Sequence, residues 1–458
     1  MKITTALNGA LLCGAAVGTS AMGACLSAEA EANNAQNKAN AGACSGAAIG
    51  GAIATSRDED WFRLDVAAAG VIDISLAHDS GIDLEWYLYN GAGSTPVAFR
   101  STMNNPEAGS FNAPAAGTYY VRVKSQSGLG RYSLTATFPA SGGGGGGAVA
   151  CTLPKKVDLG KTGNKTPLAS VTGGGIVLMG GGLDVDAALQ WMIGRAGGGD
   201  FVVLRSSGTN AYNDYIYGFG GVNSVQTLLV TSIAQANDAC VVQTIKNAGA
   251  LFLAGGDQAD YVNYFKGQGV GSAINYLINT KHAPVGGTSA GMAVQGQYYH
   301  PGGADNATVL QNPTAVAIGN NFLAHGALTN LVTEPHFAER ARQPRVTSFM
   351  ASTLYNFGAT WPAMRAVAAD ERTAVAIDSA GIGKVFGSGS AHFAMPTGAP
   401  ETLAPNTPLT WFVGNQAIRI FQVQGTASGA NSFNLGTWSG AAGSTHYWRV
   451  TNGTLTID

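Results

Sequence analysis

A serine flanked by glycines is the residue whose surroundings point most directly to chemistry. Gly287-Thr288-Ser289-Ala290-Gly291 matches the pattern G-x-S-x-G, in which the glycines permit a sharp turn from a strand into a helix and leave the serine hydroxyl exposed. A helix that begins at Ala290 would point its free amides and the positive end of its dipole at the same spot. Such amides can stabilise an oxyanion. The pattern predicts a nucleophilic serine, and the alternative is an ordinary strand-to-helix turn.

A nucleophilic serine needs a base, and the base needs a group that orients it. His336 directly follows the mostly apolar run 331–335, at the carboxyl end of a strand, where the catalytic groups of parallel sheets gather. His300 and His325 stand in less regular contexts and remain alternatives, and His336 could also be a hydrogen-bonded loop residue. The acidic pair Asp370-Glu371 precedes a later strand. It is the candidate orienting group, with a solvated loop carboxylate as the alternative.

The elements that would position these residues follow a strand-turn-helix rhythm. Short apolar runs end in Gly or Ser turns at residues 176–179, 201–204, 250–254 and 284–285, and helical stretches are predicted at 184–194, 259–266, 272–279 and 290–297. This order predicts a parallel sheet covered on both faces. After about residue 385, strands predicted at 409–413, 417–423 and 447–450 would extend or cap that sheet. The α/β domain is expected to span residues 151–458.

The first third of the chain has a different pattern. Residues 54–139 contain short segments that mostly alternate apolar and polar residues, separated by turns rich in Gly, Pro, Asn and Asp, which predicts a small β-sandwich. Residues 31–53 are small and polar without periodicity, so we expect a flexible spacer. Residues 140–150 include six consecutive glycines and predict a linker.

The amino terminus and the composition limit the class of protein. The chain has 458 residues, only 11% of them charged, and a net charge of −2, which excludes an electrostatic nucleic-acid binder. Residues 1–30 are typical of a secretory signal with cleavage after Ala30. The alternative is lipid anchoring through Cys25, which lies in a sequence similar to a lipoprotein cleavage box. No run is long and apolar enough to predict a membrane span.

The five cysteines have neither the spacing nor the histidine partners of a metal site. No metal or organic cofactor is therefore expected. In an oxidising compartment a disulfide among Cys44, Cys151 and Cys240 is expected, without a preferred pair.

Residues 54–139 resemble the bacterial pre-peptidase C-terminal domain. The resemblance rests on Asp60-Trp61-Phe62, on the segment 117–123 (GTYYVRV) and on the segment 130–134 (GRYSL). It implies a small accessory sandwich of the kind found beside secreted hydrolases. A carbohydrate-binding module, with Trp86 stacking on sugars, is the weaker alternative.

Residues 168–423 resemble cyanophycinases and related serine peptidases. Four motifs carry the resemblance: AGGDQ at 254–258, GGTSAG at 286–291, EPHFAERAR at 334–342 and DERTA at 370–374. The resemblance implies a three-layer α/β fold with a sheet like that of class I glutamine amidotransferases. It also implies the roles of seven residues: Ser289 as nucleophile, His336 as base, Glu371 as orienting acid, the amides of Gly256 and Ala290 as oxyanion hole, and Gln258 and Arg340 in the substrate pocket.

The substrate implied by the resemblance is cyanophycin, a poly-aspartate backbone with arginine on each β-carboxyl, hydrolysed to β-Asp-Arg dipeptides. A pocket for arginine needs carboxylates, and Asp257 and Glu334 are the candidates, with a structural role as the alternative for either. The family usually has Asp-Gln directly before the histidine, whereas this chain has Glu334-Pro335, and proline removes a backbone donor. The alternatives are a peptidase for other β-aspartyl or acidic peptides and a non-catalytic protein that binds a polymer or surface. The sequence leaves the oligomeric state open, a homodimer included.

Overall fold

The structure is a computed structural model that describes residues 25–91, 93–139, 152–168 and 170–458. The chain forms two compact units, Met1–Val149 and Ala150–Asp458. The expected signal residues 1–24 and the glycine run of the expected linker lie outside the described residues.

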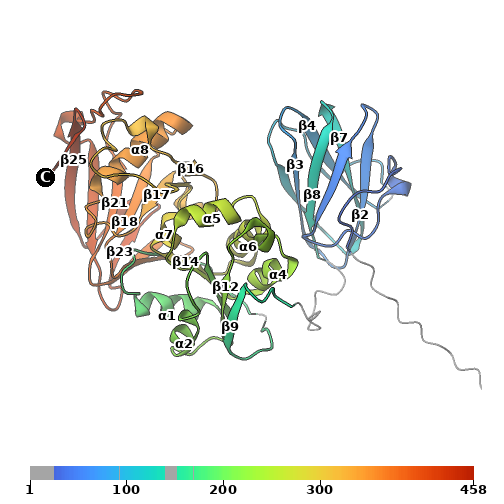
Figure 1. The fold of residues 1–458 in the computed structure, drawn as a ribbon, viewed down its shortest axis with the longest axis horizontal. Coiled ribbons are helices and arrows are strands. Elements are labelled where there is room, and N and C mark those ends of the chain that lie inside the picture. The colour runs from blue at the N-terminus through green and yellow to red at the C-terminus, as the bar shows by residue number, and fades with distance from the viewer. Residues whose placement is uncertain (1–24, 92, 140–151, 169) are drawn as a thin grey trace, which may run out of the picture. The chain divides into compact units, whose positions relative to one another are not determined.

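The N-terminal unit is a sandwich of two antiparallel four-stranded sheets (Figure 1). The first sheet has the order β1 (Ala48–Ile53), β8 (Gly130–Thr137), β3 (Gly70–His78) and β6 (Glu107–Ala113). The second has the order β2 (Glu59–Val66), β7 (Gly117–Ser127), β4 (Asp83–Asn90) and β5 (Ala98–Arg100). One short 3-10 helix, Gln36–Lys38, precedes β1. The predicted sandwich is confirmed.

Alternation along the strands produces the core of this sandwich. Tyr119, Val121 and Val123 of β7 are buried, and the residues between them are partly exposed. Because successive side chains of a strand point to opposite faces, this pattern buries one face of each sheet. Trp86 is fully buried and its indole donates a hydrogen bond to Glu107 O, so it is a core residue and not a surface for sugars.

The segment 31–53 is not a flexible spacer, and that expectation was wrong. Its residues 48–53 form β1, which pairs along its whole length with β8, and Ile49 and Ile53 are buried in the sandwich core. Asn40 accepts and donates backbone bonds with β2. The order comes from pairing with strands far along the chain, which local composition does not reveal.

The partner of Cys44 differs from the expectation. Cys44 forms a disulfide with Cys25, which was not among its expected partners; Cys240 is disulfide-bonded as well. A sulfur in a disulfide cannot carry a thioether lipid, so this pairing contradicts lipid anchoring through Cys25. Residues 25–30 also pack on the sandwich, with Ala28 bridged to Gly50, so cleavage after Ala30 would remove part of the folded unit.

The C-terminal unit contains a ten-stranded mixed sheet. Its parallel centre consists of β10 (Ile176–Met179), β14 (Val285–Thr288), β13 (Ala250–Leu253), β11 (Asp200–Arg205) and β12 (Ser224–Leu229). Antiparallel strands extend it: β9 (Asp158–Gly163) beyond β12, and β19 (Thr373–Ile377), β20 (Ile382–Gly387), β23 (Asn431–Asn434) and β24 (Ser439–Gly440) beyond β10.

Helices cover both faces of this sheet (Figure 1). One face carries α3 (Ile233–Ala236), α4 (Ala239–Asn247), α5 (Gln258–Phe265) and α6 (Gly269–Tyr276), continued by the π-helix Leu277–Lys281; the other carries α1 (Asp186–Arg195) and α2 (Tyr212–Tyr217). In β11, Val202 packs with the first group, whereas Phe201 and Val203 pack with the second. The strand is buried on both sides, which is why it reads as a continuous apolar run.

A second sheet of eight strands completes this unit. Its order is β16 (Gly319–Asn320), β15 (Tyr298–Tyr299), β17 (Leu331–Glu334), β18 (Arg365–Ala369), β21 (Ser390–Pro396), β22 (Ile418–Gln424), β25 (Ser444–Thr451) and β26 (Thr454–Ile457). The remaining helices are α7 (Ala290–Ala293), α8 (Gln343–Phe357) and the 3-10 turns Pro313–Ala315, Gly326–Leu328 and Val413–Asn415.

The predicted α/β fold class is confirmed. The C-terminal strands were expected to extend or cap the first sheet, and most of them instead form a second sheet. One hydrophobic cluster joins the two sheets, since it contains Leu178 of β10 together with Val367 of β18 and Phe393 of β21. In the part of the chain that the structure describes, no helix is long and apolar enough to cross a membrane.

Candidate active site

Ser289 lies at a sharp turn between β14 and α7. Its backbone has φ 53° and ψ −116°, a conformation that costs a non-glycine residue about 1–3 kcal/mol and is typical of functional turns. Ser289 N–H donates to Met179 O at the end of β10, so the neighbouring strand holds the turn. A Cβ atom at Gly291 would overlap Leu253 O. The close approach of α7 to β13 therefore requires glycine there, as the pattern G-x-S-x-G predicts.

His336 reaches this serine from the end of β17. Its Nε2 lies 2.6 Å from Ser289 Oγ, and its backbone N–H donates to Gly180 O. The imidazole lies against Gly181, where an added Cβ would be 2.7 Å from Nε2 and 2.9 Å from Nδ1. The glycine turn after β10 thus leaves the space that the ring occupies.

Glu371 follows β18 and completes a hydrogen-bonded chain of three side chains. Its Oε1 lies 2.7 Å from His336 Nδ1. Because an ionised carboxylate only accepts hydrogen bonds, Nδ1 carries the hydrogen and Nε2 is left to accept from the serine hydroxyl. The structure therefore brings together the three residues that the sequence singled out, in the tautomer that a general base requires.

Burial and charge favour the neutral imidazole. The pKa of His336 is lowered from its ordinary value of 6.5, first by burial and then by the positive charges of Arg340 and Arg342, whereas Glu371 opposes the shift. A neutral imidazole at neutral pH can accept a proton, which is what a base for Ser289 must do.

The predicted oxyanion residues lie beside the serine. An added Cβ at Gly255 would be 3.5 Å from Ser289 Cβ, so the Gly255-Gly256 turn after β13 borders the hydroxyl, and Ala290 follows Ser289 as the first residue of α7. The Gly255-Gly256 turn and the start of α7 therefore both border the serine.

The predicted substrate residues fall into two groups. Asp257 is exposed and caps α5 by accepting a hydrogen bond from Ala259 N–H, and Gln258, the first residue of α5, is half-buried. Arg340 is exposed, and its effect on the pKa of His336 indicates that its charge is near the imidazole. These three side chains are accessible in the described structure.

Glu334 is in a different environment. Its side chain is only 2% exposed, and its Oε1 lies 2.9 Å from Arg342 Nη1 and 2.9 Å from Arg345 Nε. Burial raises the pKa of Glu334, and the two guanidinium groups oppose that shift. The structure places Glu334 in a buried ion-pair cluster between β17 and the start of α8. Of the two roles considered from the sequence, an arginine pocket or a structural carboxylate, this position fits the structural one.

Glu339, Asp370 and His392 hold the loops that carry His336 and Glu371. Of these, only Asp370 was named from the sequence, as one of the acidic pair. Glu339 Oε2 accepts from the backbone N–H of Glu371. Asp370 accepts from Ala338 N–H, from Ser390 N–H and from His392 Nε2, at 3.1, 2.9 and 3.1 Å. These contacts fix the loop after His336 against the loop that carries Glu371. Of the pair 370–371, Glu371 contacts His336, whereas Asp370 contacts His392.

Comparison with known proteins found similarity to a domain family and to curated cyanophycinases. Residues 58–125 match the family model of the bacterial pre-peptidase C-terminal domain. The chain is 26% identical to the cyanophycinase of Nostoc sp. over 194 residues, which is 42% of this chain and 61% of that protein. It therefore spans less than two thirds of the length of this curated relative.

Two solved structures are similar to separate parts of the chain. The pre-peptidase C-terminal domain of a collagenase from Bacillus anthracis is 28% identical and covers 20% of this chain and 90% of its own, with a TM-score of 0.19. A peptidase from an acI-B1 Actinobacterium is 15% identical and covers 58% of this chain and 98% of its own, with a TM-score of 0.40. Residues 58–125 are similar to pre-peptidase C-terminal domains, and the chain also has a distant relation to cyanophycinases.

Proposed function

We propose that this chain is a secreted serine-type exopeptidase whose nucleophile is Ser289. The observation that carries the proposal is the continuous chain of hydrogen bonds from Ser289 Oγ to His336 and from His336 to Glu371. The distant relation to cyanophycinases supports the same reaction type. The chain order Ser, His, acid differs from the Ser, acid, His of α/β-hydrolases.

The reaction uses the three side chains in sequence. His336 Nε2 takes the hydroxyl proton as Ser289 Oγ bonds to the substrate carbonyl carbon, and the oxyanion accepts hydrogen bonds from the Gly256 and Ala290 amides. The C–N bond then breaks as His336 gives the proton to the leaving amine, which leaves an acyl-enzyme. Water loses a proton to His336 and attacks the ester, and Ser289 regains the proton as the acid is released. Glu371 holds the imidazole and stabilises its cation throughout.

Cyanophycin is the proposed substrate, with β-Asp-Arg dipeptides as product. The relation to cyanophycinases supports this choice. The exposed guanidinium of Arg340 can pair with a substrate carboxylate, and Asp257 offers an exposed carboxylate to a substrate guanidinium. This proposal assigns the recognition of arginine to Asp257 and not to the buried Glu334.

The test is incubation of the purified full chain with cyanophycin, followed by mass spectrometry of the soluble products. The expected result is β-Asp-Arg from the wild type and at least a 10³-fold slower release from Ser289→Ala. Ser379→Ala is the matched control, because Ser379 is an exposed serine in a turn away from β14. Undiminished release by Ser289→Ala would remove the serine mechanism.

A second candidate is the same chemistry on other β-aspartyl or acidic peptides. It is favoured by Glu334-Pro335, which stands where cyanophycinases usually have Asp-Gln, and by the sequestration of Glu334 between two arginines. Turnover of isoaspartyl dipeptides without turnover of cyanophycin would select this candidate. Retention of the polymer without any turnover would instead indicate a non-catalytic binding protein.

Export is proposed on two grounds. The matched domain is typical of secreted bacterial peptidases, and the Cys25–Cys44 disulfide is consistent with an oxidising compartment outside the cytoplasm. Recovery of the oxidised chain from culture fluid is the expected result, and recovery of reduced chain from the cytoplasm would contradict it.

A further inference from the structure

Arg342 contacts the chain on both sides of His336. Its Nη1 donates to the carbonyl oxygen of Pro335 at 3.0 Å, and its backbone N–H donates to the carbonyl oxygen of Phe337. The same Nη1 lies 2.9 Å from Oε1 of Glu334, at the end of β17. The side chain of Arg342 is only 11% exposed. Arg342 therefore holds the residues directly before and directly after the imidazole.

The turn that carries the imidazole is strained. His336 has φ 48° and Ala341 has φ 46°, values in the left-handed region that non-glycine residues rarely adopt. Arg340 N–H donates to His336 O and closes the turn. Strain of this kind persists only where the surrounding structure holds it. The turn therefore needs an anchor outside itself, and Glu334 on β17, reached through Arg342, provides one.

Glu334 binds two arginines that differ in what else they contact. Its Oε1 lies 2.9 Å from Arg342 Nη1 and 2.9 Å from Arg345 Nε. Arg345 Nη1 donates to Ala304 O at 3.1 Å, and the Arg345 guanidinium lies 5.2 Å from the ring centre of Phe349. Neither of these contacts involves the turn that carries the base. Arg342 is therefore the arginine that connects Glu334 to that turn.

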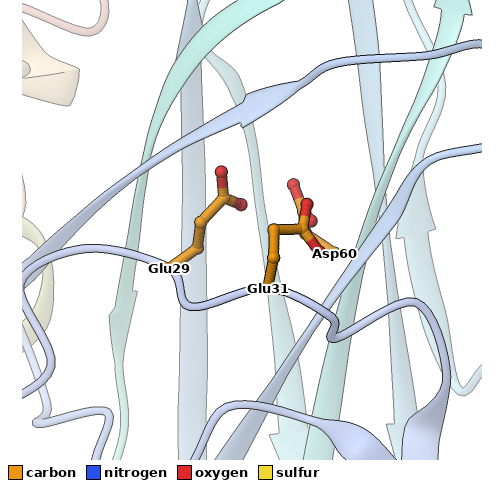
Figure 2. Close-up of side chains that lie close together, drawn as sticks. All are labelled: Glu29, Glu31 and Asp60. Atoms are coloured by element: carbon orange, nitrogen blue, oxygen red, sulfur yellow. The ribbon is translucent and has the colours of Figure 1, made fainter.

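A buried carboxylate in the N-terminal unit shows what these arginines supply. Asp60 of β2 lies close to Glu29 and Glu31 (Figure 2), and its pKa is raised first by burial and then by Glu29. Burial likewise raises the pKa of Glu334, but the two guanidinium groups beside it oppose the shift. The arginines thus favour the charged form of Glu334, which is the form that can anchor Arg342.

Arg342 also acts on the imidazole through its charge. The pKa of His336 is lowered first by burial and then by the positive charges of Arg340 and Arg342, and the hydrogen bond and charge of Glu371 oppose the shift. Arg345 is not among the groups that shift this pKa. Of the two paired arginines, one therefore affects the base by both contact and charge and the other by neither.

We propose that Arg342, anchored on Glu334, positions His336 for proton transfer from Ser289. By holding the turn 335–337, it keeps His336 Nε2 at the observed 2.6 Å from Ser289 Oγ. The inference rests on the proposed function, since it concerns the base of the same reaction. Arg342 is a positioning residue, because it acts through the imidazole and its largely buried side chain leaves substrate binding to other groups.

The test is the rate at which a fluorophosphonate labels Ser289 in the full chain, measured as a function of pH. Arg342→Met is the test variant, because methionine keeps an unbranched side chain and removes the guanidinium. Arg345→Met is the matched control, because it removes the other guanidinium from the same oxygen of Glu334. Each variant leaves Glu334 with one arginine partner, so both are expected to fold, and circular dichroism checks this. Arg342→Lys is a third variant that keeps the positive charge.

We expect Arg342→Met to be labelled about 10²-fold more slowly than the wild type, because a displaced base costs that much, and Arg345→Met to be labelled within about threefold of it. Loss of the positive charge raises the pKa of the imidazole, so the acid midpoint of the labelling rate should move to higher pH in Arg342→Met. Arg342→Lys and Arg345→Met should keep the wild-type midpoint. Arg342→Lys should also recover about tenfold of the lost rate, since an ammonium can donate to Pro335 O.

The control separates positioning from stability. A contribution of Arg342 to stability alone would slow both methionine variants alike and leave their midpoints unchanged, and that result would overturn the inference. Equal labelling of Ser289 in the wild type and Arg342→Met would also overturn it while leaving the proposed function intact. Unchanged hydrolysis by Ser289→Ala would instead remove the proposed function, and this inference with it.

Discussion

Replacing Gly181 by alanine tests whether the position of the imidazole controls Ser289. The added Cβ would lie 2.7 Å from His336 Nε2 and closer still to the ring carbon between the two nitrogens, whereas ordinary contacts begin at 3.4 Å. The ring must therefore move by about 1 Å, away from a hydroxyl that it now contacts at 2.6 Å. A displacement of this size costs about 10²-fold in rate.

The replacement also strains the backbone, and the control must match that strain. Gly181 has φ +97°, so alanine there costs about 1 kcal/mol or more in stability. Gly198 has φ +74° and no atom within 4 Å of an added Cβ. Gly198→Ala therefore carries a comparable backbone cost without touching the imidazole.

The assay is the rate at which a fluorophosphonate labels the serine, which needs no knowledge of the substrate. We expect Gly181→Ala to be labelled about 10²-fold more slowly than the wild type and Gly198→Ala to be labelled at the wild-type rate, with both variants folded by circular dichroism. Labelling of Gly181→Ala within twofold of Gly198→Ala would refute the reasoning.

Three further predictions concern the base His336, the loop carboxylate Asp370 and the Cys25–Cys44 disulfide. The lowered pKa of His336 keeps the base neutral down to pH values below 6.5, so kcat/KM should lose half its value only below pH 6.5; a midpoint above 6.5 would contradict this. Asp370→Asn should lower activity about tenfold and stability by about 2 kcal/mol, because the carboxylate accepts three hydrogen bonds at a site where its pKa is lowered despite burial; denaturant unfolding with kinetics checks both. Replacing Cys25 and Cys44 together by serine should destabilise the N-terminal unit by about 3 kcal/mol, since the disulfide closes a loop of sequence separation 19; calorimetry would show an unshifted transition if the bond contributes nothing.

The parts of the fold that sequence predicted well are those where local pattern and burial coincide. The strands β10 and β13 are fully buried four-residue apolar runs, and each ends in a glycine turn. β1 was missed because its residues Ala48–Ile53 include two glycines and two alanines, and its order depends on pairing with β8, whose residues lie 77 to 87 positions later (Ile53 with Gly130, Ala48 with Thr135). Long-range pairing of this kind leaves no local periodicity.

In the candidate site, too, some features could be predicted from local sequence and others depend on contacts between distant segments. The serine and the histidine each follow an apolar strand, so their positions at carboxyl ends of strands could be expected from the sequence. That these strands, β14 and β17, belong to two different sheets was not predicted. The environment of Glu334 could not, because its partners Arg342 and Arg345 lie around the start of α8 and reach back to β17. The run Leu331–Glu334 before His336 is compatible with Glu334 in an open pocket and with Glu334 in a buried ion pair. Only the packing of α8 against β17 decides which of the two forms.

The most direct test of the central claim is to locate the covalent label on the wild-type chain by peptide mass spectrometry and to compare the wild type with His336→Ala. The account predicts a label on Ser289 alone and at least a 10³-fold slower reaction without the imidazole. A label on another residue, or an unchanged rate in His336→Ala, would contradict it.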